Sequence, residues 1–172
     1  ELSNKKIAID TSIYMYKYQN QNALLENFYS MVSLFRQYNI TPFFVFDGKP
    51  PPEKLDLLKE RREEKILAET QYNTLMEEYE GVKLDLNKDQ KKEFLNELEV
   101  LKTKFTRLHN KDINDVKTLF QLYGVEYIEA NGEADAVCAG LVMSGKAWAC
   151  MSDDMDMFVY GCPRVIRHFS LT

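Results

Sequence analysis

The sequence predicts an α/β fold: a parallel central sheet with helices on both faces. Five short runs rich in β-branched and aromatic residues alternate with amphipathic stretches of helical period, which is typical of parallel strands buried on both faces. The expected strands cover Lys6–Asp10, Pro42–Asp47, Val125–Ile128, Ala147–Met151 and Arg164–His168. The helices expected between them cover Ala23–Tyr38, Ile113–Tyr123 and about Glu133–Met143.

A strongly charged segment, Glu53–Arg107, interrupts this alternation with 14 acidic and 12 basic residues. Its sparse apolar positions have helical spacing and suit a narrow hydrophobic seam. We therefore expect two long helices, roughly Glu53–Glu80 and Lys88–His109, that form an antiparallel pair projecting from the sheet. A solvated helix pair with no further task would carry the same charges, so composition alone assigns this insertion, at about 53–109, no function.

Length and composition fit a single folded domain. The chain has 172 residues, of which 45% are hydrophobic and 28% are charged, and its formal net charge is −5. This balance argues against disorder and against a non-specific basic wrapper of nucleic acid, but it is compatible with a local basic patch. No apolar run approaches the roughly 18–20 residues that span a bilayer, so we expect no membrane association. Because the chain begins with Glu1 rather than Met, we expect it to be a piece of a longer protein.

The sulfur and imidazole side chains offer little for a metal site. Cys138, Cys150 and Cys162 are odd in number and form no CxxC pair, which argues against a disulfide scaffold or a zinc ribbon and fits a reducing compartment. Only His109 and His168 are available as imidazole ligands. Any catalytic metal must therefore be bound by oxygen ligands.

Carboxylates follow the expected strands at the points where the strands end. Asp10 closes the first strand and Asp47 the second. Glu133 and Asp135 follow the third strand, and the acidic run Ser152–Asp156 follows the fourth. Ligands of parallel sheets bind at the carboxyl ends of the strands, so the pattern predicts that all these acids reach one edge. Any one of them alone could instead cap a helix or form an Asx turn.

Several carboxylates at one edge repel each other unless a cation lies among them. Two carboxylates about 4 Å apart cost roughly 4 kcal/mol at an effective dielectric near 20. Mg²⁺ and Mn²⁺ prefer oxygen ligands and resolve this repulsion. Two such ions about 3.5–4 Å apart can activate a water and stabilise the leaving oxygen in phosphodiester hydrolysis. The pattern therefore predicts a metal-dependent hydrolytic site.

Basic residues near this edge indicate a phosphate-bearing substrate. Lys54, Arg61 and Arg62 follow Asp47 closely, and the first two are seven residues apart, which places them on one face of a helix. They could hold the scissile phosphate and stabilise charge in the transition state. Ion pairs with neighbouring glutamates on the same helix would explain them equally well.

Three tyrosines, Tyr14, Tyr16 and Tyr18, alternate after the first strand. One of their rings could stack on a nucleobase. For at least two of the three we expect packing in the core instead.

At these residues the sequence resembles the flap endonuclease/XPG family of structure-specific 5′ nucleases, and within it the flap endonuclease branch. The similar stretches are IAIDTSIYMYKY (7–18), FVFDGKPP (44–51), ANGEADAVCA (130–139), SDDMDMFVYG (152–161) and RVIRHFS (164–170). The five stretches follow one another in the same order as in the family, and they are spread over most of the chain. The second and fourth together are specific among PIN-like folds.

The resemblance implies a PIN-like nuclease core crossed by a helical arch, through which a 5′ single strand passes. Lys54 and Arg61 resemble the arch cations that contact the scissile phosphate, and Tyr16 resembles the tyrosine that stacks on the adjacent base. Further substrate contacts implied on the arch are Arg62, Lys104 and Arg107. Two Mg²⁺ ions, replaceable by Mn²⁺, have as their implied ligands Asp10, Asp47, Glu133, Asp135, Asp154 and Asp156.

Within this ligand set the resemblance implies different roles. Asp10 and Asp47 would act largely through bound water, Asp156 would lie on the side of the second ion, and the other three would hold the tighter ion. Family members have Glu where this chain has Asp135. They also continue into a further metal-binding Asp and a duplex-binding helix–turn–helix region, which we expect this chain to lack.

The resemblance implies one nuclease domain over residues 1–172 that hydrolyses DNA phosphodiesters near single-strand/duplex junctions in replication and repair. Its expected partners are DNA with a 5′ flap or a 5′ single-strand end and, through regions outside this chain, a sliding clamp. The expected location is intracellular, in the nucleus or at a site of DNA replication, or cytoplasmic for a viral protein. Two alternatives stay open: a 5′–3′ exonuclease acting mainly on RNA or nicked duplex, and a non-catalytic module that binds metal or a protein partner.

Overall fold

The computed structural model describes residues 2–50 and 52–171 and divides into two compact units. Residues 1–51 and 108–172 form the first, which we call the core unit. Residues 52–107 form the second, which we call the hairpin unit. None of the described helices is both long enough and apolar enough to cross a membrane.

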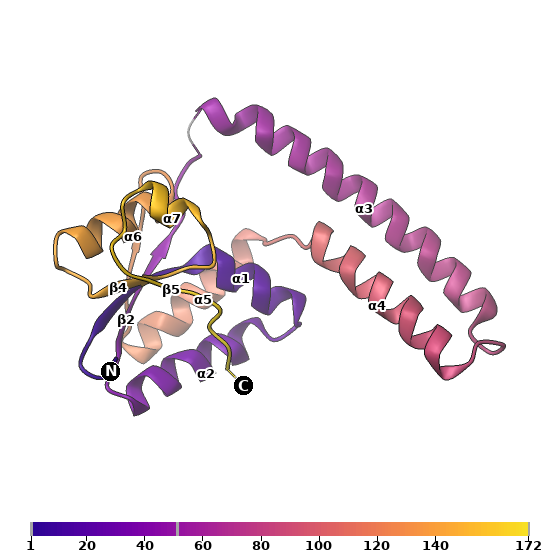
Figure 1. Ribbon diagram of the computed structural model, residues 1–172, viewed down its shortest axis with the longest axis horizontal. Helices are drawn as coiled ribbons and strands as arrows, with labels where there is room; N and C mark the ends of the chain where they lie inside the picture. Colours follow the sequence, from indigo (N-terminus) through magenta and orange to yellow (C-terminus); the bar gives the residue numbers. More distant parts are fainter. Residues whose placement is uncertain (1, 51, 172) are drawn as a thin grey trace. The chain divides into compact units, whose positions relative to one another are not determined.

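The core unit is built on a five-stranded sheet in which every pair of neighbouring strands is parallel (Figure 1). β1 (Lys6–Asp10) lies at the centre between β2 (Thr41–Phe46) and β4 (Ala149–Met151). β3 (Glu126–Glu129) and β5 (Val165–Ile166) form the two edges. The predicted parallel α/β fold is therefore confirmed.

The strand ends differ from the expected ones by a few residues. β2 ends at Phe46, so Asp47 lies just beyond the strand rather than in it. β5 has only two residues, and two positions after its end His168 adopts a left-handed conformation (φ 57°), which an extended chain does not contain. β1 and β4 end at the predicted residues, and β2 and β3 end within one residue of them.

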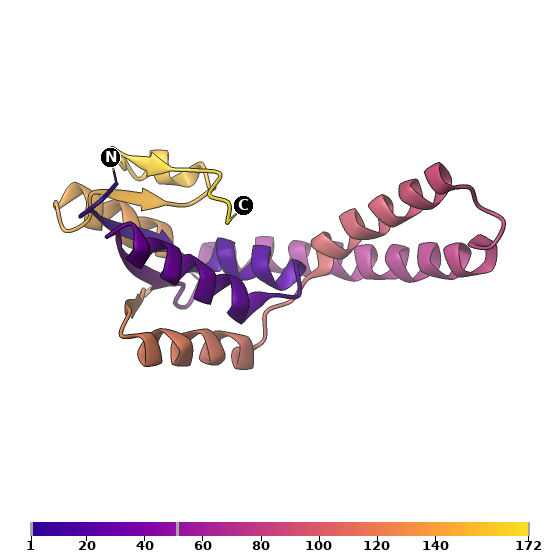
Figure 2. The same ribbon diagram turned by 90° about the horizontal axis from the view of Figure 1, so that it is seen from below.

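Alternate residues of the central strand enter two separate hydrophobic layers. The helices of the core unit are α1 (Thr11–Asn20), α2 (Leu24–Gln37), α5 (Asn110–Tyr123), α6 (Ala134–Met143) and α7 (Asp156–Val159). Ile7 and Ile9 belong to the layer formed with α1, α2 and α5, whereas Ala8 belongs to the layer formed with α6 and α7. Helices thus cover both faces of the sheet, as predicted (Figure 2).

Aromatic rings fill the first of these layers. Phe44 of β2 stacks on Phe120 of α5 with 4.1 Å between ring centroids. Phe28 of α2 meets both rings edge-on at 5.9 and 5.5 Å. All three side chains are fully buried, and contacts of this geometry contribute about 0.5–1.5 kcal/mol each beyond the burial of their area.

Two helices, α1 and α7, were not predicted from the sequence. In α1 the tyrosines look alternating, but Tyr14 and Tyr18 are four residues apart and lie on one helical face, where both are buried. Tyr16 is 41% exposed. Core packing of two of the three tyrosines is therefore confirmed. The helix begins directly after β1 because the Asp10 carboxylate accepts the backbone N–H of Ser12 at 3.1 Å.

The hairpin unit contains a short 3₁₀ turn and the two predicted long helices. These elements are η1 (Pro52–Lys54), α3 (Leu55–Val82) and α4 (Lys88–Phe105). The helices are antiparallel, because Tyr72 of α3 contacts Phe105 and Tyr79 contacts Phe94, with ring centroids 5.3 and 5.7 Å apart. α4 ends at Phe105 rather than at the expected His109, because His109 is the N-cap of α5.

Gly48 holds the end of β2 close to the loop that follows β3. Its N–H donates to the carbonyl of Gly132 at 2.7 Å, and a Cβ at Gly48 would lie 1.9 Å from the carbonyl oxygen of Ala130. Only glycine allows two backbones to approach this closely. The contact fixes the spacing between Asp47 and Glu133, which flank it in sequence.

We expect Gly48→Ala to lower the free energy of unfolding by about 2–4 kcal/mol, because the added methyl group overlaps a backbone oxygen. Urea denaturation followed by circular dichroism measures the loss. Gly132→Ala is the matched control, since nothing lies within 4 Å of a Cβ at that position. Equal losses in the two variants would contradict the steric explanation.

Candidate metal centre

Asp10, at the end of β1, is buried and accepts hydrogen bonds at both carboxylate oxygens. Only 5% of the residue is exposed. Oδ1 accepts the backbone N–H of Ser12 at 3.1 Å, and Oδ2 accepts the hydroxyl of Ser152 at 3.2 Å. Ser152 directly follows β4, so this carboxylate links the carboxyl ends of two neighbouring strands.

Asp47, just beyond β2, connects α1 with α6. Its Oδ1 accepts the backbone N–H of Ala134 at 2.8 Å, and its Oδ2 accepts the hydroxyl of Ser12. Ala134 is the first residue of α6, and the N–H groups in the first turn of a helix have no partner within the helix. Asp47 therefore supports the start of α6, and Ser12 bonds two of the predicted acids at once.

Three of the predicted acids come together. Oxygens of Asp135, Asp154 and Asp156 all lie within 4.8 Å of one another. The N–H of Asp154 donates to Ser152 Oγ at 3.1 Å, and the N–H of Asp156 donates to Asp154 Oδ1 at 2.9 Å, so a tight turn after β4 sets these two carboxylates. We call these three residues the carboxylate triad.

The triad fits a hard divalent cation. Asp135 is half-buried, and its Oδ1 is buried with no hydrogen-bond partner among the described residues. A buried carboxylate oxygen without a donor is costly. All the available donor atoms are oxygens, which are the ligands that Mg²⁺, Mn²⁺ and Ca²⁺ prefer.

Glu133 lies outside the triad. It is the N-cap residue of α6, and its Oε2 accepts the hydroxyl of Tyr160 at 3.2 Å. Tyr160 directly follows α7, so this bond connects the start of one helix with the end of another. The structure therefore groups Asp156, rather than Glu133, with Asp135 and Asp154.

Burial and crowding raise the pKa values of two acids. Burial raises the pKa of Asp10 to about 8, followed in importance by the negative charges of Asp135 and Asp47. Burial also raises the pKa of Asp135 to about 6, and Asp154 and Asp47 add to the effect. A divalent cation among these groups reverses the effect, because it favours their ionised forms.

Sequence reasoning missed the residues that hold the acids in place. Ser12, Ser152 and Tyr160 each donate a hydroxyl to a predicted ligand. One signal was available, since a serine two residues after an aspartate is a common partner in an Asx turn. Nothing in the local sequence predicts the pairing of Tyr160 with Glu133, because the two residues are 27 positions apart.

The predicted substrate-binding residues lie in both units. Tyr16 belongs to α1 of the core unit and is partly exposed. Lys54 is half-buried at the end of the 3₁₀ turn. Arg61 and Arg62 are exposed on α3, and Lys104 is exposed on α4. These four cations all belong to the hairpin unit.

Arg107, the remaining predicted contact, is part of a basic cluster in the hairpin unit. It forms an ion pair with Glu69 at 2.7 Å. Burial lowers the pKa of Lys65, and the positive charges of Arg107 and Arg61, which both lie near its ammonium group, lower it further. Lys65 donates to the carbonyl of Thr106 at 3.1 Å and was not predicted from the sequence.

Two family models match the chain: the XPG N-terminal domain over residues 1–68 and the XPG I-region over residues 124–172. Flap endonuclease 1 of Entamoeba histolytica is 32% identical over 99% of this chain and 46% of its own length. Flap endonuclease 1 of Salmo salar is 35% identical over 96% of this chain and 44% of its own length. The chain belongs to the flap endonuclease/XPG family.

Solved structures of the flap endonuclease/XPG family share the fold. Flap endonuclease-1 from Methanococcus jannaschii has a TM-score of 0.59 and 30% identity, over 96% of this chain and 53% of its own. The catalytic core of Rad2 in complex with DNA substrate has a TM-score of 0.66 and 22% identity, over 96% and 42% of the two chains. The chain spans about half the length of the curated relatives it matches.

We expect Asp10→Asn to stabilise the metal-free protein at pH 8 and to change its stability little at pH 4. The folded-state pKa of about 8 lies above the ordinary value of 3.8, so the folded protein holds a proton that the unfolded chain releases between these values. The wild type therefore loses stability from this group as the pH rises from about 4 to 8. Asparagine carries no charge and avoids that loss.

Chemical denaturation in EDTA at both pH values measures this difference, which we expect to be roughly 1–3 kcal/mol at pH 8. Asp85→Asn, in the exposed turn between α3 and α4, is the matched control. A difference between Asp10→Asn and the wild type that does not change with pH would contradict the electrostatic origin.

Proposed function

We propose that this chain is the catalytic part of a metal-dependent, structure-specific 5′ nuclease that hydrolyses DNA phosphodiesters near single-strand/duplex junctions. The observation that carries the proposal is the carboxylate triad at the carboxyl edge of a parallel sheet, in a chain of the flap endonuclease/XPG family. The relatives named flap endonuclease 1 favour a 5′ flap as the substrate. The Rad2 core, solved with a DNA substrate, favours DNA over RNA.

The proposed cofactor is a pair of Mg²⁺ ions, with Mn²⁺ able to replace them. Bound at the triad, such ions supply an activated water and stabilise the charge of the leaving oxygen. The hydroxyls of Ser12 and Tyr160 keep the surrounding carboxylates in fixed orientations, which preserves the geometry of the site before substrate arrives. The full proposed ligand set is Asp10, Asp47, Glu133, Asp135, Asp154 and Asp156.

The hairpin unit is proposed to supply the contacts to the substrate phosphates. Lys54 and Arg61 hold the scissile phosphate and stabilise the charge that develops on it. Arg107 and Lys65 add positive charge beside Arg61, which supports this role. Arg62 and Lys104 contribute further phosphate contacts.

The ring of Tyr16 is proposed to stack on the base next to the cleaved bond, because an aromatic side chain that is 41% exposed can contact a nucleobase. The hairpin unit is then an arch inserted, at about 53–109, into one nuclease domain that spans residues 1–172. The proposed partner is DNA with a 5′ flap or a 5′ single-strand end, at sites of replication and repair in the nucleus. A sliding clamp would bind through regions outside this chain.

Asp154→Asn is expected to lower Mg²⁺-dependent cleavage of a 5′-flap DNA by about 100-fold or more, because it removes a negative ligand from the triad. Gel analysis of a labelled flap measures cleavage, and calorimetry with Mn²⁺ measures binding to the same variant. Asp85→Asn serves as the control with the same chemical change. Wild-type cleavage by Asp154→Asn would refute the site, and a strong preference for an RNA flap of the same sequence would favour the exonuclease alternative.

The double variant Lys54→Ala/Arg61→Ala is expected to lower kcat by about 10- to 1,000-fold without changing Mn²⁺ affinity, because both residues act on the phosphate and neither is a metal ligand. Single-turnover cleavage and calorimetry separate the two effects. Lys91→Ala/Lys92→Ala removes the same charge from α4 and is expected to cleave normally. An equal loss in this control would show that net charge, not these two positions, controls the rate.

A further inference from the structure

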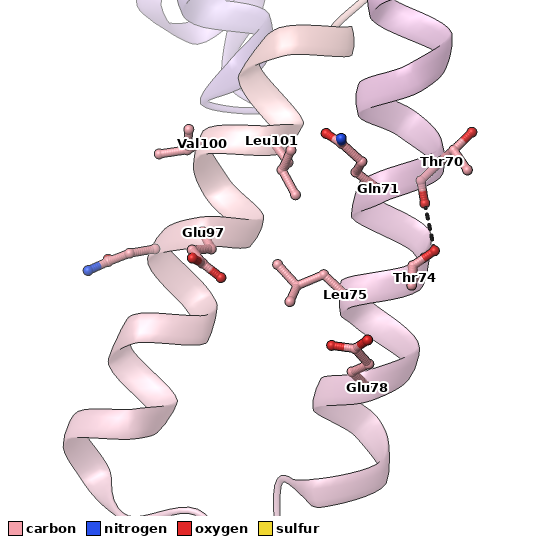
Figure 3. Close-up of a pocket in the computed structure, with 9 residues that line it drawn as sticks. Thr70, Gln71, Thr74, Leu75, Glu78, Glu97, Val100 and Leu101 are labelled. Atoms are coloured by element: carbon pink, nitrogen blue, oxygen red, sulfur yellow. Dashed lines mark hydrogen bonds between the residues drawn. The ribbon is translucent and has the colours of Figure 1, made fainter.

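A hollow in the hairpin unit has no part in the proposed chemistry. It lies between α3 and α4 and has a volume of about 630 Å³ (Figure 3). Leu75 and Leu101 point into it from the two facing helices. Its size is within the range of pockets that bind small molecules or the anchoring side chains of a docked helix.

Aromatic contacts fix the two helices on either side of the hollow. Tyr72 contacts Phe105 toward the open end of the hairpin, and Tyr79 contacts Phe94 toward the connecting turn. Both leucines of the hollow lie between these two contacts along their helices. The gap is therefore a feature of a helical pair that is packed at both ends, and not the result of helices separating at a terminus.

The surroundings of the hollow are negatively charged. Glu78 and Glu97 line it, and none of its described lining residues is basic. Residues 70–101, the far part of the hairpin, hold eight acidic and four basic residues, whereas 52–69 and 102–107 together hold six acidic and eight basic residues. Every cation proposed to contact phosphate belongs to this second group.

We propose that the hollow is the docking site of a basic amphipathic helix from a partner protein. Apolar side chains on one face of that helix fill the space between Leu75 and Leu101, as anchors at helical spacing do in other helix-in-groove complexes. Lys or Arg residues beside them contact Glu78 and Glu97. Charge complementarity sets the sign of the partner, because an apolar groove with acidic walls attracts a basic helix and repels an acidic one.

The same charges disfavour two other occupants. A single-stranded nucleic acid would bring phosphates against Glu78 and Glu97, and it would find no cation in the described lining. A second copy of this chain would bring the same acidic segment against itself, which costs free energy through like-charge contact.

The probe for this proposal is a fluorescein-labelled synthetic helix of leucine and lysine, about five turns long, with leucines on one face. Fluorescence anisotropy with the full 172-residue chain measures its binding. We expect saturable binding that weakens about tenfold in Leu101→Trp, because the larger ring fills the hollow. We expect Glu78→Gln/Glu97→Gln to weaken binding and to reduce its dependence on salt. Circular dichroism and thermal melting verify that both variants fold.

Matched controls place the same chemical changes outside the hollow. Leu84→Trp lies in the turn, where the leucine is 89% exposed, and Glu63→Gln/Glu64→Gln lies at exposed positions of α3. Both are expected to bind the probe like the wild type. Unchanged binding by Leu101→Trp, or an equal loss in the controls, would overturn the proposal.

Two further measurements distinguish the other occupants. A labelled single-stranded oligonucleotide that loses affinity only in Leu101→Trp would show that the hollow holds nucleic acid. A dimer that dissociates only in Leu101→Trp, seen by analytical ultracentrifugation, would show that it holds a second copy. Either result would overturn the proposal.

Discussion

Repulsion between carboxylates at one edge of the sheet is the constraint on which the arrangement of the core unit depends. Parallel pairing of β1 with β2 and β4 aligns their carboxyl ends, so the acids that follow these strands converge. Hydrogen bonds from hydroxyl and amide groups lower this cost without removing it: burial first, and then the charges of Asp135 and Asp47, still raise the pKa of Asp10 to about 8. A site that is costly without a cation gains the most from binding one, which couples metal binding to folding.

The donors that oppose this repulsion come from neighbouring elements. Ser12 gives its backbone N–H to Asp10 and its hydroxyl to Asp47, so one residue at the start of α1 holds the acids of two strands. Ser152 likewise connects Asp10 with the turn that carries Asp154. The ends of β1, β2 and β4 are therefore bonded to one another through these two serines, which positions Asp10, Asp47 and Asp154.

Periodicity in the sequence predicts the sheet and the edge at which its acids gather, but not the contacts within that edge. Apolar runs identify the strands because a parallel strand is buried on both faces, and the acid after each run then marks the carboxyl end. The helical nature of α1 was missed, because Tyr14, Tyr16 and Tyr18 alternate and only their burial reveals the helical face.

The set of acids that actually meet depends on geometry that residue types do not encode. Glu133 and Asp135 are two residues apart, yet the first caps α6 and bonds to Tyr160 while the second enters the triad. Asp156 enters the triad because its N–H donates to Asp154 within a turn, and turn geometry of this kind is not evident from spacing alone. The family resemblance implies six acids as metal ligands, and the structure brings oxygens of three of them within 4.8 Å of one another.

The charge distribution of the hairpin unit is compatible with the proposed phosphate contacts, although the chain as a whole is acidic. α3 has 28 residues and is about 40 Å long, whereas charges in physiological salt are screened over about 8 Å. The acidic far part of the hairpin therefore does not cancel the field of Arg61, Lys65 and Arg107 at the other end. Net charge sums over distances at which the charges no longer interact, so a value of −5 for the whole chain says little about either end. Because the two groups of charges are separated along one helical pair, the proposed phosphate contacts and the proposed docking site for a basic helix do not oppose each other.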